Sequence, residues 1–241
     1  MKLLAFDTST EVLSIGVSVG GQALLHTGAG GAQASFGLIA GVQRLLEQAQ
    51  IPMGALDAVV FGAGPGSFTG LRTACSVAQG LALGAGVPVL PVHSLLAVAE
   101  DARLSAYPDR QALEVLALLD ARMDEVYAAW FGFHEGCWTP RGETQLCKPE
   151  ALEVDQRVDM VAGNVFAVYP GRVEMALGGV PRACVAALPS AQALLRLAPQ
   201  LLREGHAVPA EQALPLYVRD KVAKTTAERQ QEKAVAGATG A

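Results

Sequence analysis

The amino-acid sequence predicts an α/β protein of two lobes, in which each lobe is a mixed sheet with flanking helices and the second lobe repeats the first. Three observations support this fold class. The chain opens with short apolar strands joined by tight turns, a similar β-meander restarts near residue 113, and helices and further strands follow each meander. With 241 residues, 51% of them apolar, the chain has enough material for a sizeable core.

The first half of the chain predicts a meander followed by three helices. The residues of Val12–Val19 alternate in the way that is typical of a β-strand, and the Gly20-Gly21 pair that follows is typical of a hairpin turn. Residues 33–50 carry apolar side chains at a helical period until Ile51-Pro52 ends the pattern. Strands are predicted at residues 3–7, 12–19, 22–27, 57–61 and 87–92, and helices at residues 33–50, 71–83 and 93–106.

The second half repeats this order in a shorter form. A loop-like stretch at residues 107–109 marks the boundary, and strands are predicted at residues 113–119, 126–133 and 158–162, with a turn at 120–124 and a helix at 190–204. We therefore expect an N-terminal lobe of residues 1–106, with part of 190–218 packing back on it, and a smaller lobe of residues 107–189. Residues 223–241 lack large apolar side chains and are expected to be disordered. Such a duplication is the architecture of the actin-like ATPase (ASKHA) superfamily.

Charge and cysteine pattern exclude several classes of protein. Proteins that bind nucleic acid without the help of a partner usually carry a basic surface, whereas this chain has a formal charge of −5. No stretch supplies the roughly 18 apolar residues of a membrane span, and the N-terminus lacks a targeting signal, so we expect a cytoplasmic protein without membrane contact. The four cysteines show no CxxC spacing and the four histidines are scattered, so no metal site is expected.

A glycine-rich loop between a strand and a helix allows two interpretations. Three glycines and one proline fall within residues 62–66, and Ser67 and Thr69 are candidate N-caps of the helix that follows. Free N–H groups at the positive end of a helix dipole form an anion site. The same loop equally joins a strand to a closely packed helix without any ligand.

Five segments, in order along nearly the whole chain, closely resemble the TsaB family. They are LLAFDTST (residues 3–10), GPGSFTGLR (64–72), AQGLA (78–82), DARMDEVY (120–127) and PLYVR (215–219). The resemblance implies a non-catalytic partner of TsaD, which transfers threonylcarbamoyl to the tRNA adenosine beside the anticodon. It also implies that TsaE joins the assembly, that tRNA is engaged only through the complex, and that the chain forms a homodimer when alone.

The resemblance places the partner surface on the helices of residues 33–50 and 71–83. We expect Ile39→Asp or Ala78→Arg to weaken association without unfolding the chain. Small residues recur at Ala74, Ala78 and Ala82, and this stripe either packs inside the lobe or faces a partner helix. The predicted interface residues are Phe36, Ile39, Val42, Leu46, Leu71, Cys75, Ala78 and Leu81.

The chain departs from the catalytic paralogue where that protein holds its metal. The paralogue carries HxxxH on its first helix, whereas residues 31–37 here read GAQASFG and offer no ligand. The glycine loop also lacks the Lys-Ser/Thr ending of a P-loop. We therefore expect no catalytic residue and no cofactor, and Arg72 is expected to pair with an acid of this chain or of a partner. Possible vestigial nucleotide loops comprise Asp7, Thr8, Ser9, Gly64, Gly66, Ser67, Thr69 and Arg72.

Two alternatives remain open at this point. One is a nucleotide-binding ATPase or small-molecule kinase of the actin-like superfamily that uses Asp7, Thr8 and the glycine loop. The other is direct tRNA binding through residues 219–233, where five basic side chains meet three acidic ones, although solubility is the simpler role for this run. The carboxylates of the 120–125 turn are assigned to structure, and His93 to a capping or core role.

Overall fold

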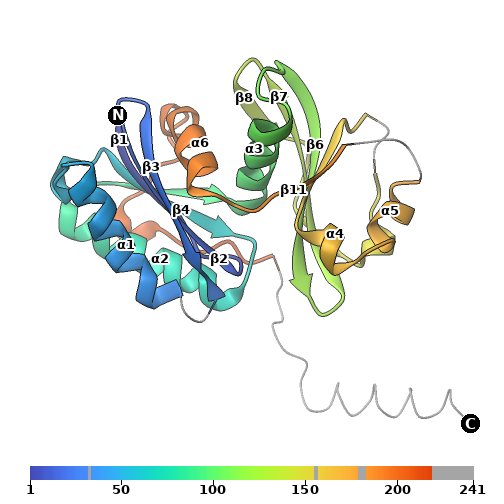
Figure 1. Cartoon of the computed structure of the whole chain (residues 1–241), viewed down its shortest axis with the longest axis horizontal. Coiled ribbons are helices and arrows are strands. Elements are labelled where there is room, and N and C mark those ends of the chain that lie inside the picture. Colours follow the sequence, from blue (N-terminus) through green and yellow to red (C-terminus); the bar gives the residue numbers. More distant parts are fainter. Residues whose placement is uncertain (32–33, 155–156, 179–182, 219–241) are drawn as a thin grey trace, which may run out of the picture.

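The computed structural model describes residues 1–31, 34–154, 157–178 and 183–218, and they form two sheets with helices around and between them (Figure 1). In the first sheet, with order β3-β2-β1-β4-β5, β1 and β2 are antiparallel while β4 and β5 run parallel to β1. Its strands are β1 (Lys2–Asp7), β2 (Val12–Val19), β3 (Gln22–Ala29), β4 (Ala58–Gly64) and β5 (Val89–His93).

The second sheet repeats this topology. Its order is β11-β10-β6-β7-β8, with β7 antiparallel to β6 and with β10 and β11 parallel to it, so the two sheets match strand by strand. The predicted two-lobed, duplicated α/β fold is confirmed. The strands are β6 (Ala112–Arg122), β7 (Glu125–His134), β8 (Cys137–Pro140), β9 (Gln145–Cys147), β10 (Met160–Gly163) and β11 (Ala183–Ala186).

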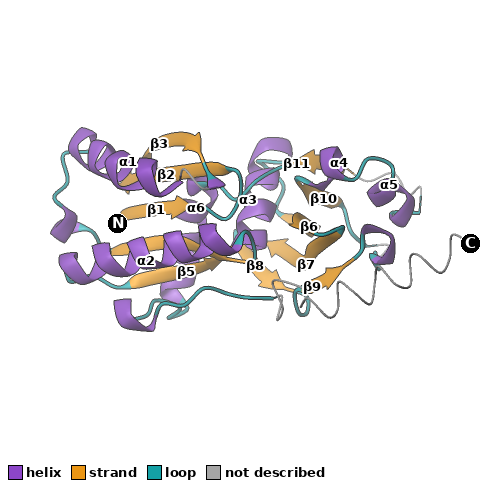
Figure 2. Ribbon diagram, turned by 90° about the horizontal axis from the view of Figure 1, so that it is seen from below, coloured by secondary structure: helices purple, strands orange, loops and turns teal. Residues whose placement is uncertain are grey.

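Four helices cover the two faces of the first sheet. Side chains alternate along β1, so Leu4 and Phe6 pack toward α1 and α2 whereas Leu3 and Ala5 pack toward α3 and α6. We call the first sheet with these helices the N-lobe, and the second sheet with two short helices the C-lobe (Figure 2). The helices are α1 (Ala34–Gln48), α2 (Phe68–Ala85), α3 (Ser94–Ala106), α4 (Val165–Val168), α5 (Arg172–Ala176) and α6 (Ala191–Arg203).

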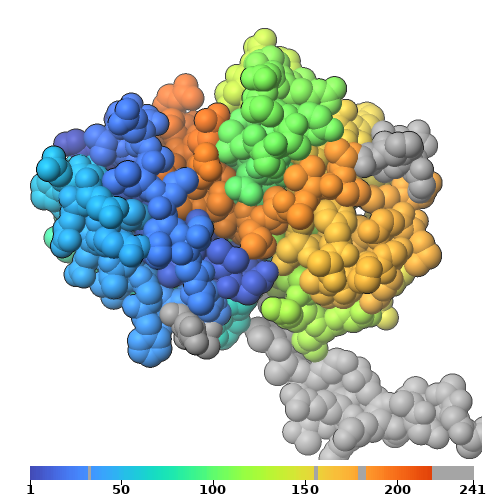
Figure 3. Space-filling model, viewed as in Figure 1, coloured from blue at the N-terminus to red at the C-terminus, as the bar shows by residue number. Residues whose placement is uncertain are grey.

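Helices α3 and α6 lie between the two sheets. One apolar cluster runs from Leu3 and Val60 of the first sheet through these helices to Val115 and Phe131 of the second. In Figure 3 the orange surface of α6 lies between the blue surface of the N-lobe and the green surface of α3. The lobes therefore share a core.

After α6 the chain returns along the N-lobe toward the glycine loop. Val208 forms a bridge with Val89 and covers the free edge of β5, and the amide of Leu216 donates to the carbonyl of Ala63 at 2.7 Å. This path brings Tyr217 to the start of α2. The 223–241 tail and the basic run from Arg219 lie outside the described residues. None of the helices described is long and apolar enough to cross a membrane.

The main differences from the sequence prediction lie at element ends and in the C-lobe. Helix α2 begins at Phe68, three residues before the predicted start, because Ser67 caps it. The predicted helix of residues 33–50 begins at Ala34, and Gln33 is not among the described residues. Strand β6 continues to Arg122, into the predicted turn. The prediction missed β8, β9, β11, α4 and α5, each of which is too short for a clear period.

Candidate functional site

The glycine loop lies directly against the turn that follows β1. A Cβ placed on Gly62 would overlap the carboxylate of Asp7, and one on Gly70 would overlap the carbonyl oxygen of Thr8. A Cβ on Gly66 would lie 2.6 Å from the Cβ of Ser9, which is also too close for an unstrained contact. These glycines are therefore required by the contact between two segments of the same lobe.

The polar groups of both segments bond to one another. The Thr8 hydroxyl donates to the carbonyl of Gly70 at 2.7 Å, and the amide of Ser67 donates to the carbonyl of Ser9 at 2.8 Å. The amide and hydroxyl of Ser9 both donate to Asp7 Oδ1, at 2.7 and 2.6 Å. The structure thus brings the predicted nucleotide loops together, with the hydroxyls of Thr8 and Ser9 already used inside the N-lobe.

Asp7 is fully buried, on the face of the sheet that carries α3. Burial raises the pKa of its carboxyl to about 6, although the hydrogen bonds from Ser9 act in the opposite direction. No described residue donates a hydrogen bond of normal geometry to its Oδ2 atom, which lies over Gly62. Beside it, the amide of Gly64 donates to the hydroxyl of Ser94 at 3.1 Å.

The first turn of α2 carries a cation that is stabilised by aromatic rings. Ser67 Oγ accepts from the amide of Gly70 at 3.1 Å and is the N-cap, whereas Thr69 is exposed in the first turn. The guanidinium of Arg72 lies 3.7 Å from the ring centroid of Phe68, and its Nε donates to the Tyr217 hydroxyl at 3.1 Å. The described part of the chain gives Arg72 no acidic partner, and its guanidinium contacts the Phe68 ring and the Tyr217 hydroxyl instead. Pairing with an acid of a partner stays a prediction.

The β6–β7 hairpin faces the glycine loop across the cleft between the lobes. Asp120 Oδ1 accepts from the Tyr169 hydroxyl and from the amide of Arg122, both at 2.8 Å, and its Oδ2 lies 3.0 Å from the Arg122 guanidinium. Burial raises the pKa of the Tyr169 hydroxyl to about 12, and its hydrogen bond to the Asp120 carboxylate acts in the same direction. Asp124 pairs with Arg172. These contacts agree with the structural role assigned to the carboxylates of this turn.

The contacts also hold an unusual backbone. Arg122, Met123 and Asp124 all have left-handed φ values, of 60°, 56° and 64°, which residues other than glycine rarely adopt. Two small hollows lie between this hairpin and the glycine loop, of about 220 and 140 Å³.

Five of the eight predicted interface residues fill the core of their own lobe. Val42, Leu46, Leu71, Cys75 and Ala78 are buried, because the apolar faces of α1 and α2 pack on the sheet. The structure therefore removes them from the predicted interface. Ala74 and Ala82 are buried beside them, so the alanine stripe packs internally.

The remaining three lie nearer the surface. Phe36 is 86% exposed and Ile39 is 47% exposed on the outer face of α1, and Leu81 is partly buried on α2. That a partner binds here stays a prediction. No cluster of three or more His, Cys, Asp or Glu side chains suited to a metal occurs among the residues described.

Comparison with known proteins identifies the family. The family model of TsaD, the tRNA N6-adenosine threonylcarbamoyltransferase, matches residues 37–227. The TsaB protein of tRNA threonylcarbamoyladenosine biosynthesis from Escherichia coli is 34% identical, over 92% of this chain and 96% of its own length. The Haemophilus influenzae TsaB is 32% identical, over 92% and 95%. The structure of YeaZ from Pseudomonas aeruginosa superposes with a TM-score of 0.79 at 37% identity, covering 90% of this chain and 99% of that one. The chain therefore belongs to the TsaB family of tRNA threonylcarbamoyladenosine biosynthesis proteins.

Proposed function

We propose that the chain is a non-catalytic scaffold and activator that binds a TsaD-type transferase, together with TsaE, for threonylcarbamoyl transfer to tRNA. One observation supports the proposal that the chain itself is not catalytic. The two loops that an actin-like enzyme would use for phosphate are packed against each other through Gly62 and Gly70. Their hydroxyls are engaged inside the N-lobe, so a phosphate would have to displace these contacts.

The outer face of α1 and α2 supports the partner role. Phe36 and Ile39 expose apolar surface on α1, and Leu83 is exposed on α2. Gly80 and Gly84 lie on the same exposed part of α2, and a Cβ on either would meet no atom within 4 Å. Exposed apolar side chains on two neighbouring helices, with small residues on one of them, suit a closely packed partner helix. We assign the homodimer of the free chain to this same face.

Association is tested with Ile39→Asp, because a carboxylate at a packed apolar seam is costly. We expect it to weaken binding to a TsaD-type partner by about 2 kcal/mol, roughly thirtyfold, and to reduce tRNA modification in the reconstituted reaction. Met175→Asp is the matched control, since Met175 is an apolar side chain on the C-lobe that is 70% exposed, against 47% for Ile39, and the change should alter neither. Unaltered affinity of Ile39→Asp would remove α1 from the interface.

The scaffold and the enzyme alternative differ in nucleotide binding. Calorimetric titration of the purified chain with ATP and Mg²⁺ is expected to show no binding. Micromolar binding with turnover would favour the ATPase or kinase instead. Reconstitution of the modification with and without the chain completes the test, because a scaffold is required for the transfer although it turns over nothing by itself.

A further inference from the structure

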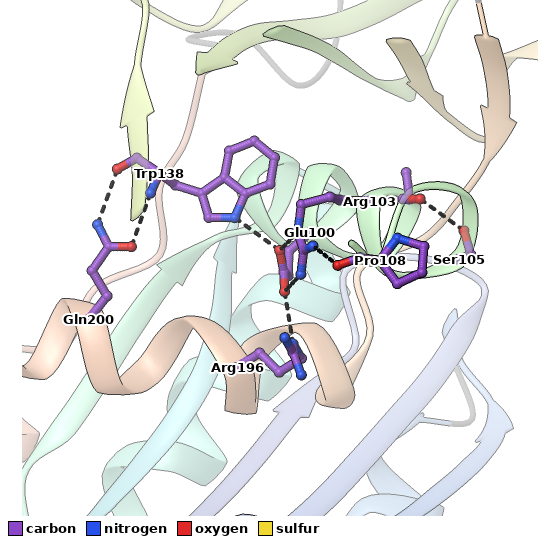
Figure 4. A network of polar contacts seen from close by, with 8 residues as sticks. Glu100, Arg103, Ser105, Pro108, Trp138, Arg196 and Gln200 are labelled. Atoms are coloured by element: carbon purple, nitrogen blue, oxygen red, sulfur yellow. Dashed lines mark hydrogen bonds and ion pairs between the residues drawn. The ribbon is translucent and has the colours of Figure 1, made fainter. Parts of the chain in front are cut away.

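A buried carboxylate takes part in the contact between the lobes. Glu100 of α3 is 3% exposed, and each of its oxygens accepts two hydrogen bonds (Figure 4). Arg103 Nε and the indole Nε1 of Trp138 donate to Oε2, at 2.8 and 3.0 Å. Arg103 NH2 and Arg196 Nε donate to Oε1, both at 3.0 Å. The acceptor capacity of the carboxylate is therefore fully used.

The donors come from three different elements. Arg103 lies one turn further along α3, Arg196 lies on α6, and Trp138 lies on β8 of the C-lobe. Gln200 of α6 adds a second tie, because its side chain accepts from the amide of Trp138 and donates to the carbonyl of Trp138, both at 3.1 Å. We call Glu100, Arg103, Trp138, Arg196 and Gln200 the interlobe cluster.

The surroundings leave the interlobe cluster little freedom. The Arg103 guanidinium lies 4.5 Å from the ring centroid of Phe133 and donates to the carbonyl of Pro108 at 3.0 Å. The Trp138 ring packs against Phe133 and Phe131, with centroids 5.0 and 6.4 Å apart. A shift of Trp138 would leave the buried carboxylate of Glu100 with one hydrogen-bond donor fewer, which is unfavourable for a charge that is shielded from water.

The interlobe cluster lies far from the cleft between the glycine loop and the β6–β7 hairpin. Trp138 pairs with Phe133, near the opposite end of β7 from the hairpin at Glu125. At 3.3 Å per residue this separation is about 25 Å along the strand. Figure 1 shows β8 and the hairpin at opposite ends of the C-lobe. A rotation of the lobes about the middle of the shared layer of α3 and α6 would open or close the cleft at one end and would move Trp138 against these helices at the other.

We infer that the interlobe cluster holds the two lobes at one fixed angle, so that the protein presents both lobes to its surroundings as a rigid body and does not close around a ligand between them. This inference goes beyond the scaffold role and does not depend on it. A rigid two-lobed molecule differs from hinged two-lobed enzymes, which complete their sites by domain closure.

The inference is tested by measuring distances between spin labels on the two lobes of the full chain. Labels are placed at Leu83→Cys on α2 and Met175→Cys on α5, both highly exposed positions. Cys137, Cys147 and Cys184 are replaced by serine, and the buried Cys75 is retained. Pulsed electron spin resonance is expected to give one narrow distance distribution, whereas Glu100→Gln should at least double its width. Glu114→Gln, which removes the charge from the exposed pair with Arg141, is the control and should leave the width unchanged.

Two results would overturn the inference. One is a broad or two-peaked distribution in the chain with Glu100 intact. The other is an unchanged width in a Glu100→Gln variant that keeps its circular dichroism. If that variant does not fold, Trp138→Phe replaces it, since phenylalanine retains an aromatic ring but loses the indole N–H and part of the ring volume. A folded Trp138→Phe chain with an unchanged width would equally contradict the fixed angle.

Discussion

Two buried titratable side chains, Asp7 and His93, oppose each other in their effect on stability. The Asp7 carboxyl has a pKa of about 6 in the folded chain and an ordinary value of 3.8, so the unfolded chain releases this proton first as the pH rises. The protonated Asp7 carboxyl therefore contributes fully to the stability of the fold below pH 3.8, and this contribution is lost as the pH rises to 6. The difference corresponds to about 3 kcal/mol of folding free energy.

His93 acts in the other direction. Its Nδ1 accepts from the amide of Leu95 at 3.2 Å, which caps α3, and its Nε2 lies 2.8 Å from the hydroxyl of Thr144 in the C-lobe. Burial lowers its pKa to about 4 from 6.5. Its contribution is therefore complete above pH 6.5 and decreases by about 3 kcal/mol as the pH falls through 4.

Single substitutions should separate these two effects. Between pH 4 and 6.5 the contributions of Asp7 and His93 largely cancel in the parent chain. In Asp7→Asn, whose amide oxygen still accepts from Ser9, stability is expected to rise with pH by up to about 3 kcal/mol. In His93→Asn, a non-titrating cap, stability should instead fall with pH. Urea unfolding at half-unit pH steps measures both slopes, and parallel curves for the two variants would contradict the assignment.

The roles of some single residues could be predicted from their neighbours in the sequence, and the roles of others could not. Ser67 and His93 were predictable as caps, because a cap is recognised from its place before a helix. Burial of Ala78 was not, because an apolar stripe at a helical period does not say whether it faces the core or a partner. Glu100 was overlooked, although an acid three residues before an arginine, directly after the apolar run from Leu95 to Ala99, is a usable signal.

At the scale of elements, the junction of β4 and α2 depends on one glycine in the first turn of the helix. A methyl group on Gly70 would overlap the backbone carbonyl of Thr8, which cannot move without displacing β1. We expect Gly70→Ala to lower the free energy of unfolding by about 2–3 kcal/mol. Gly80→Ala in the same helix meets no neighbour and should raise it by about 0.5–1 kcal/mol.

Chemical unfolding of the two alanine variants checks this contrast. Similar stabilities would mean that the loop relaxes away from the turn and that the glycines are not required by packing. This outcome would also reopen the loop as an anion site, since space would then exist between the two segments. The free energy difference between the variants thus bears on the structural interpretation of the loop as well as on its stability.

Elements with a full hydrophobic period were predictable, and short ones were not. The N-lobe strands and α1, α2, α3 and α6 are long enough for a period of 2 or 3.6 to appear. In the C-lobe, β9 has three residues and α4 has four, and they are held by neighbours far along the chain. The cleft depends on such neighbours too, since Tyr169 and Arg172 fix the hairpin from 45 or more residues away.

At the scale of the whole molecule, each lobe has an apolar cluster on its outer side, but the two lobes share the cluster that lies between the sheets. The α3 side of the first sheet is also covered by α6, which follows the last strand of the C-lobe, and the amide of Ala191 donates to the hydroxyl of Ser14 at 2.8 Å. The shared apolar cluster continues from Leu3 to Phe131 across both sheets. Unfolding of either lobe would therefore expose the apolar surface of the other.

The two lobes are therefore expected to unfold in one cooperative transition. Both tryptophans, Trp130 and Trp138, lie on C-lobe strands, so their fluorescence reports the second sheet. The four long helices α1, α2, α3 and α6 surround the first sheet and dominate the far-ultraviolet circular dichroism. Both signals should give the same urea midpoint, since a shared core does not allow one lobe to persist alone. Phe131→Ala, which thins this core, should lower both midpoints together. An early fluorescence transition that leaves the helical signal intact would instead show that the N-lobe is stable by itself, and that the layer of α3 and α6 only joins two separate domains.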